Sequence, residues 1–325
     1  MPVLVTGCAG FIGYHVCRAL LARGERVAGI DNLSPYYDVT LKEARLAMLV
    51  EHAEFAFARA DIADHDVLSA AFGSLGPVLK VVHLAAQAGV RHSLEHPFAY
   101  THSNIEGHLA ILEACRHTEG FQHLVYASSS SVYGGNTKLP FSVDDRVDRP
   151  VSLYAATKRG GEMMSHAYSH LYGIPQTALR FFTVYGPWGR PDMAMYLFTK
   201  AILAGEPIRV FNRGEMARDF TYVDDVVAGT IAALDRPPLS GDGVPHRTFN
   251  LGNHRSEPLL KLIELIEKAV GKRANTILEP MQPGDVAETY ANIDASQRDL
   301  GFAPRTSLAD GVPRFVAWYR EFYGV

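Results

Sequence analysis

The sequence predicts an α/β protein with a doubly wound parallel sheet and a smaller, mixed α/β lobe at its C-terminal end. In the first 182 residues, short apolar runs alternate with segments of helical periodicity, a pattern typical of parallel sheets. The apolar runs, such as VVHLAA and HLVYAS, are continuous, as expected for strands covered on both faces. After residue 183 this alternation stops at a segment rich in Gly and Pro, VYGPWGRPDM.

The elements follow from these patterns in chain order. Strands are expected at residues 2–6, 26–31, 54–59, 79–85, 122–128 and 176–182. Helices are expected between them, near residues 12–23, 41–52, 64–73, 103–118 and 154–172. Beyond the break we expect helices near 194–204, from 224, near 258–270 and near 307–322, and strands near 208–211 and 247–251. We therefore predict two domains, residues 1–182 and 183–325, with some segments crossing back.

Composition and charge exclude several classes of function. The 325 residues are 47% apolar, which is ordinary for a globular protein. A net charge of −4 without a basic run predicts no nucleic-acid or membrane partner. Three cysteines without a CxxC pair, and histidines without HExxH spacing, predict neither a disulfide scaffold nor a metal site. The absence of a signal-peptide pattern or an apolar stretch of membrane-spanning length predicts a cytoplasmic protein.

A glycine motif lies between the first predicted strand and the first predicted helix. Gly7 permits a tight turn, Gly10 lets the backbone approach a pyrophosphate, and Gly13 allows close packing of helix and strand. The helix N-terminus faces the bound anion. With an acidic residue ending the next strand, this context predicts a dinucleotide site of the Rossmann type. We include the intervening Phe11 and Ile12 in the expected cofactor site.

The acidic residue at the end of the second predicted strand indicates which dinucleotide binds. The Asp31 carboxylate can accept hydrogen bonds from both ribose hydroxyls, and it would repel a 2′-phosphate. Because no Arg follows immediately, Asp31 and the adjacent Asn32 predict NAD rather than NADP. Asp61 and Ile62, after the third strand, are expected to bracket the adenine, although Asp61 is nearly as typical of a turn or helix cap.

A tyrosine and a lysine provide candidate acid–base chemistry. Tyr154 and Lys158 are four residues apart in the predicted helix YAATK and therefore share one face. A nearby lysine cation favours the phenolate, so Tyr154 can act as a base near neutral pH. Alone, such a pair is typical of an ordinary amphipathic helix. Here it follows a strand that ends in four serines within a dinucleotide fold, which favours a catalytic role.

Together, the glycine motif, HLAA, SSSSVYG and YAATK resemble the extended short-chain dehydrogenase/reductase superfamily. The resemblance implies that Ser129 holds a substrate hydroxyl and that Tyr154 is the base. It implies that Lys158 binds the nicotinamide ribose and tunes Tyr154. It also implies cofactor contacts in the HLAA stretch, namely Leu84, Ala85 and Ala86.

Longer stretches narrow the resemblance to the UDP-glucuronate 4-epimerases. They are DNLSPYYDVTLKEARL, HLAAQAGVRHS, RFFTVYGPWGRPDMA and ARDFTYVDDVV, and the matches extend from residue 3 to about residue 295. This resemblance implies an NAD-dependent isomerase that oxidises C4 of a UDP-sugar, turns the 4-keto sugar over and reduces it again. Family members often dimerise through the helices corresponding to 103–118 and 154–172, so a homodimer is expected.

The serine run bears on the outcome of the reaction. Similar dehydratases carry an acidic pair, and similar decarboxylases a Glu, near Ser130 and Ser131 of this chain; without such acids, water elimination is poorly served. A 4-ketone beside a C5 carboxylate can lose CO₂ when that bond aligns with the carbonyl. We expect hydroxyl donors to hold the carboxylate out of this alignment, although serines in such a run also satisfy backbone groups. The candidates are Ser128, Ser129, Ser130 and Thr183.

Three further residues are expected to hold the nucleotide part of the substrate. Arg218 resembles the family's diphosphate-binding arginine, and Arg190 is a second candidate; either is also typical of a surface ion pair. Phe211 is expected to pack on the uracil or to lie in the core. Two alternative activities stay open, namely a 4-epimerase of neutral UDP-hexoses and a UDP-glucuronate decarboxylase. The intact catalytic residues disfavour a silent NAD-binding regulator.

Overall fold

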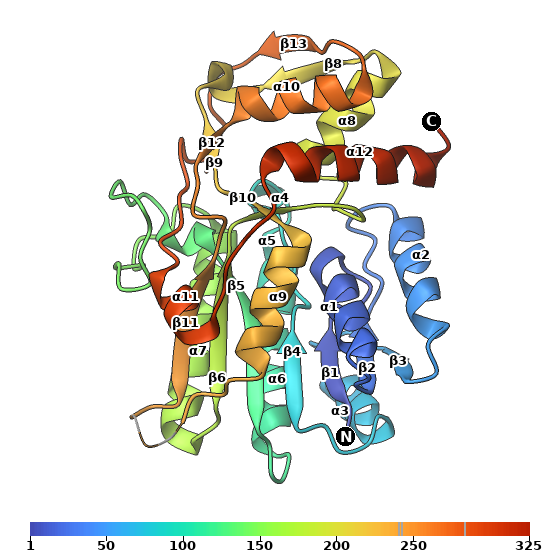
Figure 1. Ribbon diagram of the computed structural model, residues 1–325. Helices are drawn as coiled ribbons and strands as arrows, with labels where there is room; N and C mark the ends of the chain where they lie inside the picture. The colour runs from blue at the N-terminus through green and yellow to red at the C-terminus, as the bar shows by residue number, and fades with distance from the viewer. Residues whose placement is uncertain (240, 242, 283) are drawn as a thin grey trace.

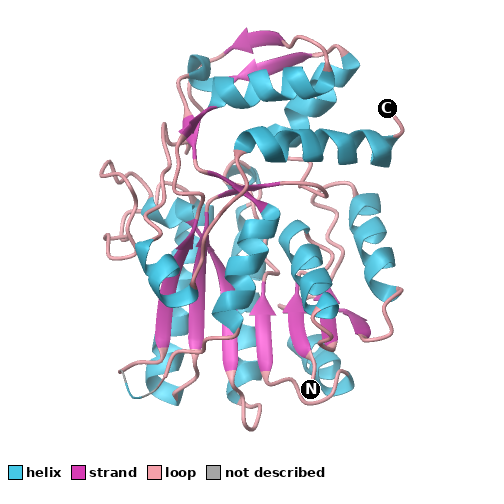
Figure 2. Ribbon diagram, viewed as in Figure 1, coloured by secondary structure: helices cyan, strands magenta, loops and turns pink. Residues whose placement is uncertain are grey.

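The structure is a computed structural model that describes residues 1–325 except 240, 242 and 283. The described residues form a central parallel sheet of seven strands, with helices on both faces (Figures 1 and 2). The strands are β1 (Val3–Thr6), β2 (Val27–Asp31), β3 (Phe55–Arg59), β4 (Lys80–His83), β5 (His123–Ser129), β6 (Gln176–Phe181) and β11 (His246–Leu251). Their order across the sheet is β11-β6-β5-β4-β1-β2-β3. The predicted doubly wound fold is thus confirmed.

Alternate side chains of each strand enter two separate cores, one on each face of the sheet. In β1, for example, Val3 and Val5 pack on one side and Leu4 on the other, as the period of two in a strand requires. One face is covered by α1 (Phe11–Ala22), α2 (Val39–Val50) and α9 (Val223–Leu234). The other is covered by α3 (His65–Ser74), α6 (Gly107–Arg116) and α7 (Leu153–Tyr172).

A smaller lobe lies beyond the carboxyl ends of the strands (Figure 1). It contains α8 (Ala194–Ala204), β8 (Pro207–Val210), α10 (Leu259–Val270), β13 (Asn275–Leu278) and α12 (Leu308–Tyr323). Strands β8 and β13 pair in parallel, and α10 packs between α8 and α12. Helix α10 buries residues spaced three or four apart, which gives it one apolar face.

Shorter elements complete the fold. Four short strands form two pairs: β7 (Thr183–Tyr185) with β10 (Phe220–Tyr222), parallel, and β9 (Ala217–Arg218) with β12 (Glu257–Pro258), antiparallel. The short helical elements are α4 (His92–Glu95), α5 (Pro97–Thr101), a π-helical turn at His102–Glu106, 3₁₀ turns at Ser130–Tyr133 and Phe211–Gly214, and α11 (Asp294–Leu300). The sequence analysis predicted none of these as separate elements.

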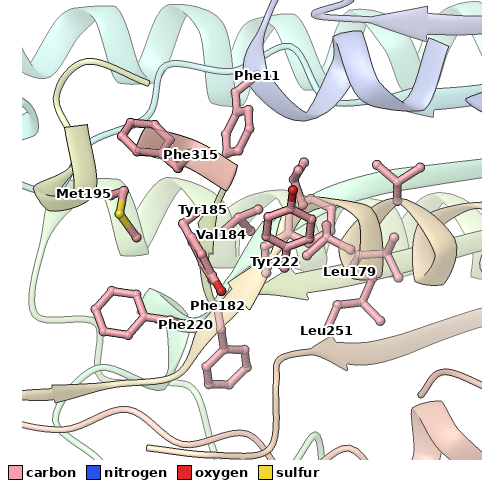
Figure 3. Close-up of a cluster of buried hydrophobic side chains, with 14 of the residues drawn as sticks. Phe11, Leu179, Phe182, Val184, Tyr185, Met195, Phe220, Tyr222, Leu251 and Phe315 are labelled. Atoms are coloured by element: carbon pink, nitrogen blue, oxygen red, sulfur yellow. The ribbon is translucent and has the colours of Figure 1, made fainter. Parts of the chain in front are cut away.

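One apolar cluster joins the sheet to the smaller lobe. Figure 3 shows side chains from α1, β6 and β11 beside side chains from β7, β10, α8 and α12, including Phe11, Phe220 and Phe315. Each large apolar side chain buried here contributes about 1.5–3 kcal/mol of stability. Because β11 and α9 come from beyond residue 183 and join the sheet, chain segments cross between the two parts. The boundary at residue 182 stays a prediction. Within the part of the chain that the structure describes, no helix has the length and apolar character needed to cross a bilayer.

Candidate active site

Two cavities meet where the strands of the sheet end. The sheet cavity, of about 250 Å³, is lined mainly by the strand ends and the loops that follow them. The lobe cavity, of about 850 Å³, is lined mainly by residues of the smaller lobe. Both are lined by Phe11, Tyr36, Val184, Arg190 and Met193. A ligand that extends from one cavity into the other must therefore pass these side chains.

The glycine motif forms a cradle that a side chain would fill. Gly7 has a φ of +72°, and a Cβ atom there would lie 2.7 Å from the amide nitrogen of Ala85. A Cβ atom on Gly13 would lie 2.0 Å from the carbonyl oxygen of Gly7, so the start of α1 packs directly on the turn. This close backbone packing fits a bound pyrophosphate. All the predicted cofactor residues line the sheet cavity: Gly7, Gly10, Phe11, Ile12, Gly13, Asp31, Asn32, Asp61, Ile62, Leu84, Ala85, Ala86, Tyr154 and Lys158.

Acidic and basic groups lie together at the end of β2. The buried Asp31 carboxylate accepts hydrogen bonds from the backbone amides of Ala9 (3.1 Å) and Leu33 (2.8 Å). The sequence analysis missed Lys42 of α2, which also lines this cavity and donates to the carbonyl oxygen of Ser34 at 2.9 Å. Burial lowers the pKa of Lys42, and the Asp31 charge partly offsets the shift. The only sequence signal for Lys42 is the stretch SPYYDVTLK, which gives no spatial information.

Ser129, Tyr154 and Lys158 all line the sheet cavity. Burial raises the pKa of Tyr154, and the Ser129 hydroxyl and the positive charge of Arg190 oppose this rise. We expected the opposing cation to be Lys158, but the ammonium group of Lys158 donates to the carbonyl oxygen of Ala127 at 3.0 Å. Burial lowers the pKa of Lys158 to about 8.

A local cap and a side chain from another helical segment position α7, which carries Tyr154 and Lys158. The Ser152 side chain caps α7 by accepting a hydrogen bond from the amide of Ala155. The π-helical turn preceding α6 places Asn104 against α7, where its amide donates to Thr157 Oγ1 at 3.1 Å. The Asn104 side chain also bonds both backbone groups of Gln87, in the loop after β4. Asn104 therefore ties α7 to the wall of the sheet cavity.

The serines of the run differ in their hydrogen bonds and in whether they line a cavity. The Ser128 hydroxyl donates to the buried Glu162 carboxylate at 2.6 Å, so only its lone pairs remain for a ligand. Ser129 Oγ accepts a hydrogen bond from the Ser131 amide at 3.2 Å and still lines the sheet cavity. Ser130 is absent from the lining of both cavities as the described residues form them, whereas Thr183 lines the lobe cavity.

An ion pair occupies the junction of the two cavities. Arg190 Nε donates to Asp192 Oδ1 at 3.0 Å, and the Tyr36 hydroxyl donates to Asp192 Oδ2 at 2.9 Å. Burial alone would raise the pKa of Asp192, but the Arg190 charge and the hydrogen bonds from Arg190, Tyr36 and the backbone together outweigh it, and the pKa is lowered. The sequence analysis predicted Arg190 and missed Tyr36 and Asp192, because their contact depends on how two distant loops pack.

The lobe cavity contains the other predicted substrate residues, Phe211 and Arg218. The guanidinium of Arg91 lies 4.4 Å from the centre of the Phe211 ring and pairs with Asp285 at 2.8 Å. Arg218 donates to the carbonyl oxygens of Ala217 and Ala287, both at 3.0 Å. Burial lowers the pKa of Arg218. The lobe cavity thus offers an aromatic ring and a buried guanidinium group.

Comparisons with a family model and with known proteins agree on one family. Residues 3–252 match the model of the NAD dependent epimerase/dehydratase family. UDP-glucuronate 4-epimerase 4 of Arabidopsis thaliana is 49% identical over 99% of this chain and 76% of its own length. A probable UDP-glucuronate 4-epimerase of Rhizobium meliloti is 45% identical over 99% of this chain and 98% of its own length.

A solved structure is similar over the whole fold. The UDP-glucuronic acid 4-epimerase of Bacillus cereus, in complex with UDP-glucuronic acid and NAD, superposes with a TM-score of 0.91 at 37% identity. The match covers 99% of this chain and 100% of that one. With a family model matched over most of the chain and relatives near 50% identity, the chain belongs to the NAD dependent epimerase/dehydratase family.

Proposed function

We propose that this protein interconverts UDP-glucuronate and UDP-galacturonate by inverting the sugar at C4. The observation that carries the proposal is the meeting of the two cavities beside Ser129, Tyr154 and Arg190. One cavity has the glycine cradle of a dinucleotide site, and the other has room for a nucleotide. The names of the relatives and the ligands of the Bacillus cereus structure support the same substrate.

The sheet cavity would hold NAD through its glycine cradle and Asp31. When bound, NAD would supply the redox chemistry, namely hydride transfer from C4 and back to C4. The Asp31 oxygens, each with one backbone donor, keep lone pairs for ribose hydroxyls. We assign the nicotinamide ribose to Lys158, as the family resemblance implies.

Within this chain, Tyr154 carries out the proton transfer. Its phenolate takes the proton of the sugar 4-hydroxyl and later returns it, while Ser129 holds that hydroxyl in place. The Arg190 charge favours the phenolate, which offsets part of the effect of burial. The family resemblance also implies that Lys158 tunes Tyr154; its ammonium group donates to the carbonyl oxygen of Ala127.

The remaining polar groups would position the sugar acid and the diphosphate. Arg190 is close enough to influence Tyr154, so we assign it to the sugar end of the substrate and Arg218 to the diphosphate. Phe211 packs on the uracil. Thr183 is the better donor for the C5 carboxylate, because the Ser128 proton already bonds Glu162, Ser129 is assigned to the 4-hydroxyl, and Ser130 lies outside both cavity linings.

Incubating the purified protein with UDP-glucuronate, without added reductant, and separating the products tests the function. UDP-galacturonate is expected. A parallel reaction with UDP-glucose distinguishes the rival epimerase, because a strong preference for the neutral sugar would overturn our choice of substrate. Release of CO₂ with a UDP-pentose as the main product would indicate a decarboxylase.

We further propose a cytoplasmic homodimer that pairs through α6 and α7, and a working division into residues 1–182 and 183–325. Helix α7 exposes three large apolar side chains, Met163, Leu171 and Tyr172, and unpartnered apolar surface of this kind favours association. Light scattering during size-exclusion chromatography measures the assembly. A monomer mass at micromolar concentration would contradict the homodimer.

A further inference from the structure

The short helix α4 brings three potential metal ligands together at the edge of the lobe cavity. The stretch HSLEH supplies His92, Glu95 and His96, whose ligand atoms all lie within 4.8 Å of one another. This order of residues differs from HExxH, the spacing on which the expectation of no metal site was based. His92 and Glu95 line the lobe cavity, and His96 is exposed outside it.

The geometry of the two histidines suits a shared ion. His92 begins α4 and His96 directly follows it, and their ring centroids are 4.3 Å apart. The Tyr36 ring packs on His92 with centroids 4.6 Å apart. Because Tyr36 also bonds Asp192, this contact restricts the rotation of His92, and less side-chain entropy is lost when an ion binds.

The ligand set selects the class of ion. Two imidazoles and one carboxylate match the N and O ligands of zinc, nickel, copper and cobalt, whereas magnesium and calcium prefer all-oxygen sites. We propose that His92, Glu95 and His96 bind one divalent transition-metal ion of the zinc class at the edge of the lobe cavity. Water completes its coordination.

A bound ion would change the electrostatics of the cavity. An ion of charge +2 with one carboxylate ligand leaves a net positive charge beside residues that line the lobe cavity. If the proposed function holds, that cavity receives a diphosphate and a sugar carboxylate, all anionic. Coulomb attraction, screened by salt, should then tighten UDP-glucuronate binding by about two- to threefold. This second effect rests on the proposed function, whereas metal binding itself does not.

Metal titration of the full-length, tag-free, metal-stripped protein tests the site. Adding Co²⁺ should produce the absorption of a histidine-bound ion and saturate at one equivalent, and Zn²⁺ should displace the Co²⁺. His92→Ala and His96→Ala should each abolish this tight equivalent, while His52→Ala, at an exposed histidine outside the cluster, should retain it. Circular dichroism verifies that each variant is folded. No bound equivalent in the wild type, or an unchanged equivalent in folded His92→Ala and His96→Ala, overturns the site.

Calorimetry of UDP-glucuronate binding with and without Zn²⁺ tests the electrostatic effect. The wild type should bind more tightly with Zn²⁺, and His96→Ala, whose side chain is outside the cavity lining, should show no change. An equal response of the two proteins would mean that Zn²⁺ acts elsewhere, for example on the free nucleotide, and would overturn this effect. The Co²⁺ titration needs no turnover, so its failure is distinguishable from failure of the proposed function.

Discussion

At the scale of single residues, the protonation of Tyr154 is the central feature of the site. Burial disfavours the phenolate, and a neighbouring hydroxyl and a neighbouring arginine favour it. Arg190 is itself paired with Asp192, whose negative charge raises the pKa of Tyr154 and so weakens the effect of the arginine. A tyrosine accepts a proton only as its phenolate, and a nearby cation and a hydroxyl donor both favour that form.

Replacing Tyr154 by Phe should reduce kcat by about 10²- to 10⁴-fold, because only the proton-transfer group is lost. NAD affinity should change little, since the ring remains. Turnover assays and a dinucleotide titration check both expectations. Normal epimerisation by this variant would refute the role of Tyr154.

The lowered pKa of Lys158 predicts a basic limit to activity. The site needs the ammonium form, which predominates below a pH of about 8 and is lost as the pH rises through that value. The kcat of the wild type should therefore fall above about pH 8. Lys158→Arg keeps its charge at high pH, so its residual activity should lack this decline. An identical decline in both proteins would assign it to another group.

Thr183 is expected to help retain CO₂ at the keto stage. Thr183→Ala removes a hydroxyl that lines the lobe cavity, and the loss of one hydrogen bond, worth about 1 kcal/mol, should raise the ratio of CO₂ to epimer about fivefold. Ser130→Ala serves as the matched control, because Ser130 is outside both linings. Equal partitioning in wild type and Thr183→Ala would remove the carboxylate-holding role.

At the scale of elements, buried charges hold the loops of the site. Glu162 of α7 accepts from Arg180 of β6 at 2.9 Å through both oxygens, and also from Ser128 at the end of β5. Arg180 donates in turn to the Tyr133 hydroxyl at 3.1 Å. A buried pair with this many bonds is costly to break on one side only, so it fixes the orientation of the strand end that carries the serines.

Arg45 of α2 connects the glycine loop to the loop of Arg190. It is fully buried, and it donates to the carbonyl oxygens of Ala9 at 2.9 Å and Trp188 at 2.6 Å. Trp188 has a φ of +62°, a conformation that needs outside support. Arg45 is therefore a positioning residue for both cavities.

Arg45→Met should raise the KM for UDP-glucuronate and weaken NAD binding together, each by about tenfold or more, because both loops lose the same anchor. Arg23→Ala, at an exposed ion pair just after α1, should leave both unchanged. Binding titrations with folded variants measure the two affinities. If only one affinity changes, the connection between the loops is wrong.

The site could be predicted where its residues belong to a local motif or to a stretch that resembles the family. Gly7, Gly10 and Gly13, and likewise Tyr154 and Lys158, are set by local spacing, so the structure brings them into one cavity as expected. Tyr36, Lys42 and Asp192 were missed because α2, the loop before it and the loop before α8 reach the site by tertiary packing. The hydrogen bond from Ser128 to Glu162 depends on side-chain orientation, which spacing does not encode.

At the scale of the whole molecule, most of the fold was predictable because its strands are continuous apolar runs between helices. All six strands expected in the first part were found within two residues of their predicted bounds. The parallel pair β7–β10 was missed because each strand has only three residues, and its partner lies far along the chain. The same non-local pairing places Thr183 and Arg218 around one cavity.

The measurement that tests the proposed mechanism most directly traces the hydrogen atom on C4 of the sugar. UDP-glucuronate carrying deuterium at C4 is incubated with the enzyme in ordinary water. The products are then separated and analysed by mass spectrometry. The account predicts UDP-galacturonate that keeps its deuterium at C4, because the same hydrogen leaves and returns within a closed site. Product with solvent hydrogen at C4, or deuterium retained without inversion, would contradict it.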